Sequence, residues 1–464
     1  MLNKKVLKKL NKIFGSKNVL SKYKDLVFYQ YDASLDRGLP DAVVFPQSTE
    51  QIVKLVDLCR QYDIPLIPRG SGTNLSGGSV AICGGIIIQF SHLNRILEID
   101  LENHCAIVEP GVYNLDLQTA LAPYGFYFAP DPASQRVSTI GGNVAENAGG
   151  PHCLKYGVTI NHILGLEIVT ADGEVLQIGG KAEQYPGYDL MSLLIGSEGT
   201  LGIVTKIIVK ILPLPEGIKT MLVIFNSMEQ AAQAVSDIIA EGIIPATLEI
   251  MDKPIIETVE STHHLGYPED AEAVLLVELD GPIAGMESLA NEVTTVCKKN
   301  GAYKIESATT SDQRDSLWKG RRLSFGSLTM LQPSVMIADG TVPRSKVPAV
   351  LKEVMDICGK YDLKVGNVFH AGDGNLHPFI LFDDRNPVDT KKVKKACDEI
   401  LKVCIKAGGT ISGEHGIGLE KKASMKVLFN NQELNTMQKI KTIFDPKGIL
   451  NPNKIFPATE VDNI

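Results

Sequence analysis

The pattern of apolar and polar positions divides the chain into two parts. From Asp41 a strand (42–45), a helix (48–61) and a strand (64–67) follow one another, and the helix carries its apolar residues on one face. Short apolar runs predict further strands at 86–90, 96–99 and 105–108. A second group lies at 163–170, 175–178 and 203–212. The two groups predict two subdomains.

After Pro213 and Pro215 the pattern changes to a β-α-β-β-α-β order. The predicted strands are 219–225, 246–251, 273–279 and 303–307, and the helices are 227–241 and 286–300. This is the ferredoxin-like order, which predicts a split sheet with helices on one face. At the other end of the chain, apolar residues at helical spacing alternate with lysines over residues 2–13. We expect a first helix packed on its own domain; the alternative is a helix that binds a partner or a membrane surface.

Length and charge narrow the classes of protein. A chain of 464 residues is expected to form two or more domains. Its net charge of −8 offers no basic surface for nucleic acid. No apolar run is long enough for a transmembrane segment and no secretory leader is seen, so we expect a cytoplasmic protein. The eight cysteines contain no C-x-x-C pair, which argues against iron–sulfur or zinc-finger ligation. A homo- or hetero-oligomer is possible.

Two stretches rich in glycine and small polar residues suit a phosphate-bearing ligand. The first runs from Pro68 to Gly78, where backbone N–H groups can converge on one point, although a plain turn has the same composition. Leu75 stands where the dinucleotide fingerprint of the doubly wound fold requires glycine. The second stretch comprises 130–134, 138–143 and 146–150.

A second set of candidates points to a metal. His370 and His377 flank a Gly-Asp-Gly-Asn turn between two apolar strands, so a hairpin can bring the two imidazoles together. Glu414 and His415 follow in a glycine-rich segment. With Glu414, the histidines form a three-ligand set that leaves room for a substrate oxygen. A structural histidine pair is the alternative.

These motifs together resemble the FAD-linked oxidases of the vanillyl-alcohol oxidase type, and within them the D-2-hydroxyacid dehydrogenases related to the glycolate oxidase flavoprotein subunit. The resemblance covers nearly the whole chain. It implies an α+β fold with a two-subdomain FAD-binding domain and a ferredoxin-like cap. The implied boundaries are an N-terminal helical extension (1–35), the FAD-binding domain (36–215), the cap with its metal site (216–425) and a segment returning to the FAD domain (426–464).

The resemblance also implies non-covalent FAD between the two subdomains; covalent attachment through Cys153 is the alternative. The implied FAD-binding residues are Pro68, Arg69, Gly70, Ser71, Gly72, Thr73, Asn74, Ser76, Gly77, Pro130, Asp131, Ser134, Ser138, Gly141, Gly142, Asn143, Asn147, Gly149, Gly150, Glu198, Gly202, Ile203, Val204 and Asn451.

For the cap, the resemblance implies that His370, His377 and Glu414 bind a divalent metal (zinc, iron or manganese) and that His415 is the base. Arg321, in the segment with Trp318 and Lys319, is implied to hold the substrate carboxylate, and Lys319 and His415 are also implied to bind the substrate. Hydroxyglutarate-type enzymes carry a lysine for a distal carboxylate, but residues 335–338 are apolar here, and Pro378 and Phe379 follow His377. We therefore expect a small D-2-hydroxyacid, D-lactate first and glycolate second.

The chain has no motif for a second redox cofactor, so reduced flavin requires an external acceptor. An electron-transfer flavoprotein or an iron–sulfur subunit is expected, and the lysine-rich first helix is a candidate docking element. Two other functions stay open. One is a metal-dependent hydrolase or lyase without redox chemistry, and the other is a non-catalytic electron-transfer subunit that keeps FAD.

Overall fold

The computed structural model describes residues 2–182 and 186–457, which form two compact units. Unit 1 comprises Met1–Gly149, Val158–Leu214 and Glu414–Ile464, and unit 2 comprises Gly150–Gly157 and Pro215–Gly413. Residues 414–425, which the sequence placed in the cap, cluster with unit 1. Among the described residues, none of the helices has the length and apolar character that crossing a lipid bilayer requires.

The first sheet of unit 1 has four strands in the order β1–β2–β4–β3. Their bounds are β1 (Val19–Leu20), β2 (Ala42–Val44), β3 (Leu66–Arg69) and β4 (Ile86–Gln89). Helices α1 (Lys4–Phe14) and α3 (Thr49–Tyr62) pack together beside this sheet, and Val6, Leu10 and Phe14 of α1 are buried in the same core as Leu55. The first helix thus buries its apolar face in its own unit, and its lysines cover the outside.

The second sheet of unit 1 has the order β5–β6–β10–β8–β9. Its strands are β5 (Ile96–Asp100), β6 (Cys105–Val108), β8 (Ile163–Val169), β9 (Val175–Gly179) and β10 (Ile203–Lys210). The sequence grouped β5 and β6 with the first sheet, which is wrong. Residues 105–108 pair antiparallel with 207–210, so the hairpin extends the sheet of a strand about a hundred residues later in the chain.

Helices α4 (Asn114–Leu121), α5 (Ile140–Glu146) and α7 (Leu190–Leu194) contribute to the core of this second sheet. The C-terminal helices α14 (Met425–Leu428) and α15 (Asn431–Phe444) also belong to unit 1, and Ile440 and Phe444 of α15 pack on the same core. Beyond α15, Leu450 pairs with Leu66 of β3 as an isolated parallel bridge. The end of the described chain therefore lies beside the strand that leads into the first glycine-rich loop.

Unit 2 is built on a sheet in the order β15–β12–β14–β13–β18–β19–β17. The strands are β12 (Gly217–Phe225), β13 (Thr247–Asp252), β14 (Ala273–Gly281), β15 (Lys304–Ser307), β17 (Gly340–Thr341), β18 (Lys364–His370) and β19 (Asn375–Leu376); β16 (Ser334–Ile337) and β20 (Pro378–Phe382) pair beside β18. The first four strands stand in the antiparallel ferredoxin-like arrangement.

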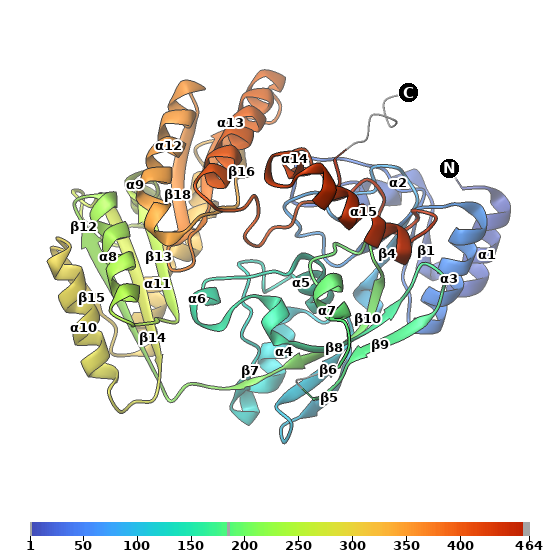
Figure 1. Cartoon of the computed structure of the whole chain (residues 1–464), viewed down its shortest axis with the longest axis horizontal. Coiled ribbons are helices and arrows are strands. Elements are labelled where there is room, and N and C mark those ends of the chain that lie inside the picture. Colours follow the sequence, from blue (N-terminus) through green and yellow to red (C-terminus); the bar gives the residue numbers. More distant parts are fainter. Residues whose placement is uncertain (1, 183–185, 458–464) are drawn as a thin grey trace. The chain divides into compact units, whose positions relative to one another are not determined.

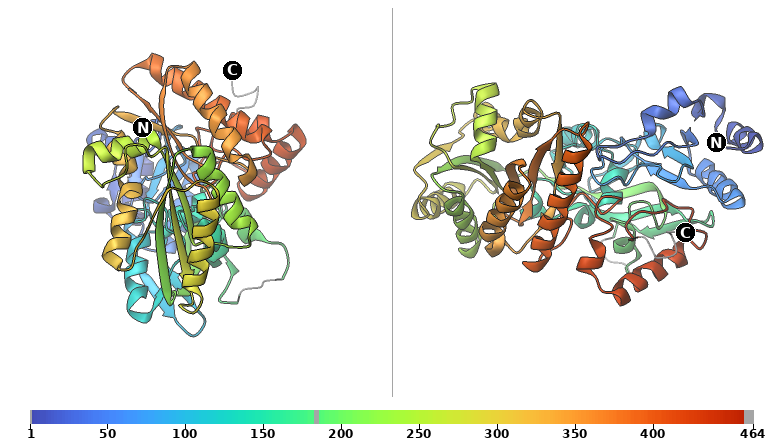
Figure 2. Two further views of the ribbon diagram at one scale, coloured as in Figure 1. Left: turned by 90° about the vertical axis from the view of Figure 1, so that its left-hand side faces the viewer. Right: turned by 90° about the horizontal axis from the view of Figure 1, so that it is seen from above.

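Helices cover both faces of this sheet, and not one face as the sequence predicted. Helices α8 (Met228–Ala240) and α10 (Met286–Lys299) pack side by side against β12 and β14 (Figure 1). Helices α9 (Lys253–His263) and α11 (Ser311–Leu328) pack on each other and form a core with the opposite face (Figure 2). The sequence missed α9, which Asp252 caps by accepting from Ile255 N. Helices α12 (Val347–Lys360) and α13 (Pro387–Lys406) complete the unit.

Candidate active site

The first glycine-rich loop follows β3 in unit 1 and is folded around one side chain. Asn74 Oδ1 accepts hydrogen bonds from the backbone N of Ser76 at 3.0 Å and of Gly78 at 2.6 Å. Gly72 and Gly77 have φ angles of 74° and 83°, which side-chain-bearing residues rarely adopt. A Cβ on Gly70 would clash with Thr139 Oγ1. The absence of side chains therefore lets this loop pack against the second glycine-rich stretch.

The side chain of Arg69, a predicted FAD-binding residue, contacts other residues of unit 1 and is enclosed by the first glycine-rich loop. Its buried guanidinium donates to Ser79 Oγ at 3.3 Å and lies over the Tyr29 ring. A Cβ on Gly72 would clash with this guanidinium, so the loop wraps around it. Burial lowers the pKa of Arg69, and the nearby Asp32 carboxylate opposes this change.

The second glycine-rich stretch is held in place by a residue that the sequence analysis missed. Asn114, which is fully buried, donates from Nδ2 to Pro130 O at 2.9 Å and from its backbone N to Ser138 O at 3.0 Å. Thr139 then caps helix α5 by accepting from Gly142 N. A lone asparagine outside the glycine-rich stretches carries no sequence signal for this role.

Asn451 connects three separate stretches of unit 1. Its Nδ2 donates to the backbone oxygens of Gly78 at 2.8 Å and Glu198 at 2.7 Å. Glu198 has a φ of 53°, and its carboxylate accepts hydrogen bonds from Ile417 N and Gly418 N. The carboxylate of Glu198, a predicted FAD-binding residue, is therefore engaged by the protein backbone.

Several buried polar atoms of unit 1 have no hydrogen-bond partner among the described residues. They are Asn114 Oδ1, Ser138 Oγ, Asn143 Nδ2, Glu146 Oε2 and Asn451 Oδ1. Each such atom left without a partner costs about 1–3 kcal/mol, and these atoms lie in or next to the two glycine-rich stretches. A dinucleotide, which is long and carries many polar atoms, fits this set of donors and acceptors.

His415 is tied to the first loop through its backbone. Its carbonyl oxygen accepts from Ser76 Oγ at 3.1 Å and from Asn74 Nδ2 at 3.4 Å. The imidazole is mostly buried, with Nε2 at 3.9 Å from Glu414 Oε1. The predicted base is thus held by the same loop that the sequence assigned to the cofactor.

In unit 2 the hairpin brings the two predicted histidine ligands together. His370 ends β18 and pairs with Asn375 of β19, and His377 precedes β20. The centroids of the two imidazole rings are 5.0 Å apart and the rings are almost perpendicular. Both side chains are buried.

Glu249 of β13, absent from the predicted site, connects His370 with Arg321. Its Oε1 contacts His370 Nδ1, and its Oε2 accepts from Arg321 Nε at 2.6 Å. Burial alone would raise the pKa of the Glu249 carboxyl, but the charges and hydrogen bonds of His370 and Arg321 outweigh burial and lower it. A single acid in an otherwise apolar strand was the available signal, because a buried charge requires a partner.

The two predicted substrate-binding residues of helix α11, Lys319 and Arg321, differ in their burial. Arg321 lies toward Glu249 and is largely buried, whereas Lys319 is exposed. With Nε engaged by Glu249, the terminal edge of the Arg321 guanidinium is the part suited to a carboxylate. Trp318 is buried and donates from Nε1 to Glu278 Oε2 at 2.9 Å.

The segment leading to Glu414 is fixed to unit 2 up to Gly413. Asp339, fully buried, accepts from Ser412 Oγ at 2.7 Å and from Gly413 N at 3.1 Å. A Cβ on Gly413 would clash with the side chain of Asn375 in the histidine hairpin. Gly413 is therefore held beside this hairpin, and Glu414 is the next residue in the chain.

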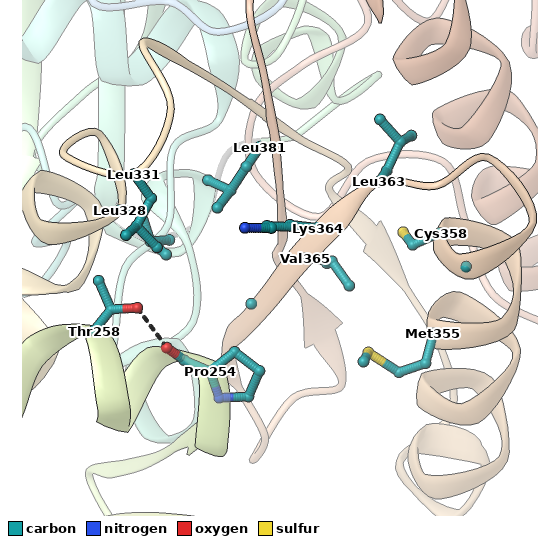
Figure 3. A pocket seen from close by; sticks show the side chains of 12 residues that line it. Pro254, Thr258, Leu328, Leu331, Met355, Cys358, Leu363, Lys364, Val365 and Leu381 are labelled. Carbon is teal, nitrogen blue, oxygen red and sulfur yellow. Dashed lines mark hydrogen bonds between the residues drawn. The ribbon is translucent and has the colours of Figure 1, made fainter.

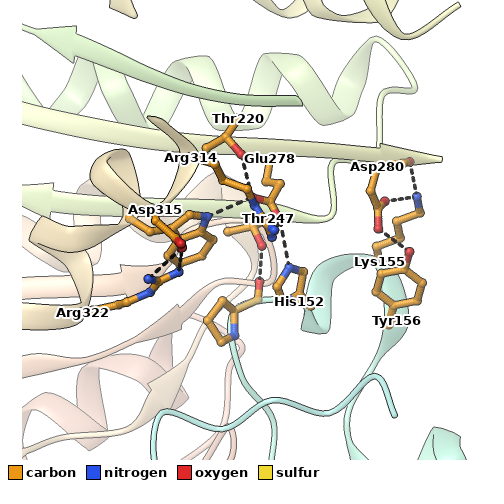
Figure 4. A network of polar contacts seen from close by, with 12 residues as sticks. His152, Lys155, Tyr156, Thr220, Thr247, Glu278, Asp280, Arg314, Asp315 and Arg322 are labelled. Atoms are coloured by element: carbon orange, nitrogen blue, oxygen red, sulfur yellow. Dashed lines mark hydrogen bonds and ion pairs between the residues drawn. The ribbon is translucent and has the colours of Figure 1, made fainter. Parts of the chain in front are cut away.

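A second buried carboxylate of unit 2 is surrounded by donors (Figure 4). Glu278 of β14 accepts from Thr220 Oγ1 at 2.7 Å, from Trp318 Nε1 and from Arg314 through two hydrogen bonds, and His152 Nε2 lies 3.3 Å away. Burial would raise its pKa, but the hydrogen bonds and charges of His152 and Arg314 lower it strongly. His152 precedes α6 (Cys153–Tyr156), whose Lys155 and Tyr156 bind Asp280.

Unit 2 also has an apolar pocket of about 330 Å³ between α9, the end of α11, α12 and β18 (Figure 3). Leu328, Leu331, Met355 and Leu381 line it, and Lys364 is its charged member. The pocket lacks a convergent set of polar groups, so its lining does not suit a polar substrate.

Comparison with known proteins identifies the family. Residues 40–179 match the family model described as "FAD binding domain", and residues 214–455 match "FAD linked oxidases, C-terminal domain". The chain belongs to the FAD-linked oxidase family. It is therefore an FAD-linked oxidoreductase, and the predicted resemblance is confirmed.

Two curated relatives in this family cover almost the whole chain. The chain is 43% identical to the glycolate oxidase subunit GlcD of Bacillus subtilis (strain 168) over 98% of its own length and 97% of that protein. It is 32% identical to a D-lactate dehydrogenase of Anaerostipes hadrus, over 90% of each protein.

Solved structures show the same fold. A p-cresol methylhydroxylase structure with bound substrate matches with a TM-score of 0.83 at 20% identity, covering 99% of this chain and 97% of that one. A 4-ethylphenol oxidase from Gulosibacter chungangensis matches with a TM-score of 0.81 over 99% and 98% of the two chains. The predicted α+β fold with an FAD-binding domain of the vanillyl-alcohol oxidase type is confirmed.

Proposed function

We propose that this FAD-linked oxidase converts a small D-2-hydroxyacid to the 2-oxoacid with the help of a divalent metal. D-lactate is the first candidate substrate and glycolate the second. The observation that carries the proposal is the Glu249 carboxylate, which binds a candidate metal ligand, His370, and the candidate carboxylate-binding residue, Arg321. Relatives named glycolate oxidase subunit and D-lactate dehydrogenase support the same reaction class.

Each residue has a defined role in the proposed reaction. Arg321 binds the substrate carboxylate through its terminal edge and so fixes the orientation of C2. His415 accepts the hydroxyl proton as general base. When bound, FAD would serve as the acceptor of the hydride from C2 of the substrate. His370, His377 and Glu414 are the proposed ligands of the metal, which supplies Lewis acidity toward the hydroxyl oxygen.

Glu249 acts through other residues. A carboxylate on the Nδ1 side of an imidazole fixes the tautomer that leaves Nε2 free to bind a metal. Because the same carboxylate also holds Arg321 Nε, the positions of the metal ligand and of the carboxylate-binding fork are coupled. We therefore assign Glu249 as a positioning residue.

The proposal of a monocarboxylate rests on the apolar strands beside the hairpin. In β16 and β20, Met336 pairs with Ile380 and Ile337 pairs with Phe379. These side chains offer no cation to a distal carboxylate, so lactate and glycolate fit better than a dicarboxylate.

Anaerobic titration of the purified, metal-replete protein with D- and L-2-hydroxyacids tests the proposal through the flavin absorbance. We expect bleaching by D-lactate, weaker bleaching by glycolate and none by L-lactate. Absence of bleaching with every acid in the panel would contradict it. Reoxidation by added electron-transfer flavoprotein or by an iron–sulfur subunit then distinguishes the two proposed acceptors.

A further inference from the structure

The carboxyl group of Glu146 lies among the residues assigned to the cofactor. The proposed reaction gives this group no role. Glu146 ends helix α5, three residues after Asn143, so the two side chains share one face of the helix. A Cβ on Gly78 would lie 2.9 Å from Glu146 Oε1, and a Cβ on Gly416 would clash with Oε2. The carboxyl therefore sits between the first glycine-rich loop and the segment that carries His415.

Glu146 Oε2 is buried and has no hydrogen-bond partner among the described residues. The neighbouring acid, Glu198, differs because its carboxylate accepts from Ile417 N and Gly418 N. Two carboxyl groups at one buried place cannot both ionise at low cost. The backbone donors favour the negative charge on Glu198, which leaves the proton on Glu146.

The surrounding charges agree with this assignment. Burial and the charges of Glu198 and Asp32 raise the pKa of Glu146 well above its ordinary value, and Lys454 and Lys421 oppose the shift. Burial raises the pKa of Glu198 as well, and the N–H groups of Gly418 and Ile417 only reduce this upward shift. Lys454 is itself engaged, because its Nζ donates to Val80 O at 2.7 Å and also to Gly77 O.

A neutral carboxylic acid has one O–H group to donate, and Glu146 Oε2 has no hydrogen-bond partner among the described residues. Ser138, Asn143 and Asn451, which carry further buried atoms without partners, belong to the predicted FAD-binding set. We propose that Glu146 is an additional FAD-binding residue, held as the neutral acid, whose hydroxyl donates a hydrogen bond to an acceptor atom of the cofactor. The inference rests on the FAD-dependent function proposed above.

The test compares FAD affinity of the full-length protein in the natural form and in the variants E146Q and E146A. FAD is removed and then titrated back, and flavin fluorescence reports binding in the absence of substrate. We expect E146Q, whose amide still donates, to bind FAD within about threefold of the natural protein, and E146A to bind about tenfold more weakly. The matched control is E167Q, because Glu167 is buried in the same unit but is partnered by Thr49, Thr205, Gln177 and Lys206.

The pH dependence of the same titration separates a hydrogen bond from a loss of packing. FAD binding to the natural protein should weaken as pH rises through the raised pKa of Glu146, whereas binding to E146Q should not change with pH. Equal affinities for E146A and the natural protein, or equal losses in E146Q and E146A, would overturn the inference. Should E146A not fold, the pH profiles of E146Q and the natural protein decide alone. Because no hydroxyacid is present, failure of the proposed oxidation leaves this result unaffected.

Discussion

Glu249 and Glu278 of unit 2 have the opposite environment to Glu146 of unit 1. In unit 2, Glu249 and Glu278 are each surrounded by cations and hydrogen-bond donors, and the pKa of both is lowered. In unit 1, Glu146 lies beside another acid, has an oxygen without a partner and has a raised pKa. Glu249 and Glu278 thus have cationic and hydrogen-bonding partners within unit 2. Around the stretches of unit 1 assigned to FAD, several buried polar atoms have no partner among the described residues.

Asp252 shows that the direction of the pKa shift depends on the partners of the acid and not on the unit in which it lies. It lies in unit 2 and accepts hydrogen bonds from Ile255 N and from the backbone N and Nδ2 of Asn367, all of them neutral. Burial raises its pKa to about 7 in spite of these bonds. A buried acid therefore stays ionised here when arginine or histidine contacts it, as at Glu249 and Glu278.

The largest expected effect is a loss of flavin reduction without a loss of bound FAD. Replacing His415 by Ala removes the proposed base but keeps the backbone oxygen that Ser76 and Asn74 bind. We expect flavin reduction by D-lactate to slow by roughly 100- to 10,000-fold while FAD stays bound. Stopped-flow absorbance measures the reduction, and H263A at the end of α9 is the control. Normal bleaching in H415A would remove His415 from the mechanism.

The two ionised acids of unit 2 should differ in function although both are buried. E249Q loses the charge that holds His370 and Arg321, so we expect metal affinity to fall by about 10- to 100-fold and KM to rise. E278Q perturbs the same sheet without touching either residue. Metal analysis and steady-state kinetics compare the variants. An E278Q variant that loses as much metal as E249Q would show that general damage to the sheet explains both.

The stability of unit 2 toward acid is the next effect. The folded-state pKa of Glu278 is lowered, so its contribution is fully present above the unfolded-state value near ~4.3 and is lost as pH falls below it. We expect E278Q to be less stable than the natural protein at neutral pH and to lose less stability on acidification. Thermal unfolding at several pH values measures this, with E353Q as the control because Glu353 is exposed on α12. Parallel curves for E278Q and the natural protein would contradict the assignment.

The sequence predicted features that depend on local chain chemistry and missed those that depend on distant partners. The glycine-rich loop, the histidine hairpin and most strands follow from short-range patterns, and the structure forms them. Sheet membership of β5 and β6 required knowing that β6 pairs with β10, a much later strand. Glu249 and Glu146 likewise gain their meaning from residues far along the chain. An unpaired acid in a buried strand or helix is the sequence signal that could have marked both.

The smallest expected effect is on the pH dependence of the stability of the FAD-free protein, through Glu146 of unit 1. A raised folded-state pKa means that folded Glu146 keeps a proton which the unfolded chain releases, so stability falls as pH rises above ~4.3. E146Q cannot release a proton, and we expect the FAD-free variant to lose less stability with rising pH, by at most about 1.4 kcal/mol per pH unit. Chemical unfolding of both FAD-free proteins across neutral pH measures the slopes. Identical slopes would mean that Glu146 is ionised in the folded protein, and the contrast between the two units would then rest on the missing hydrogen-bond partners alone.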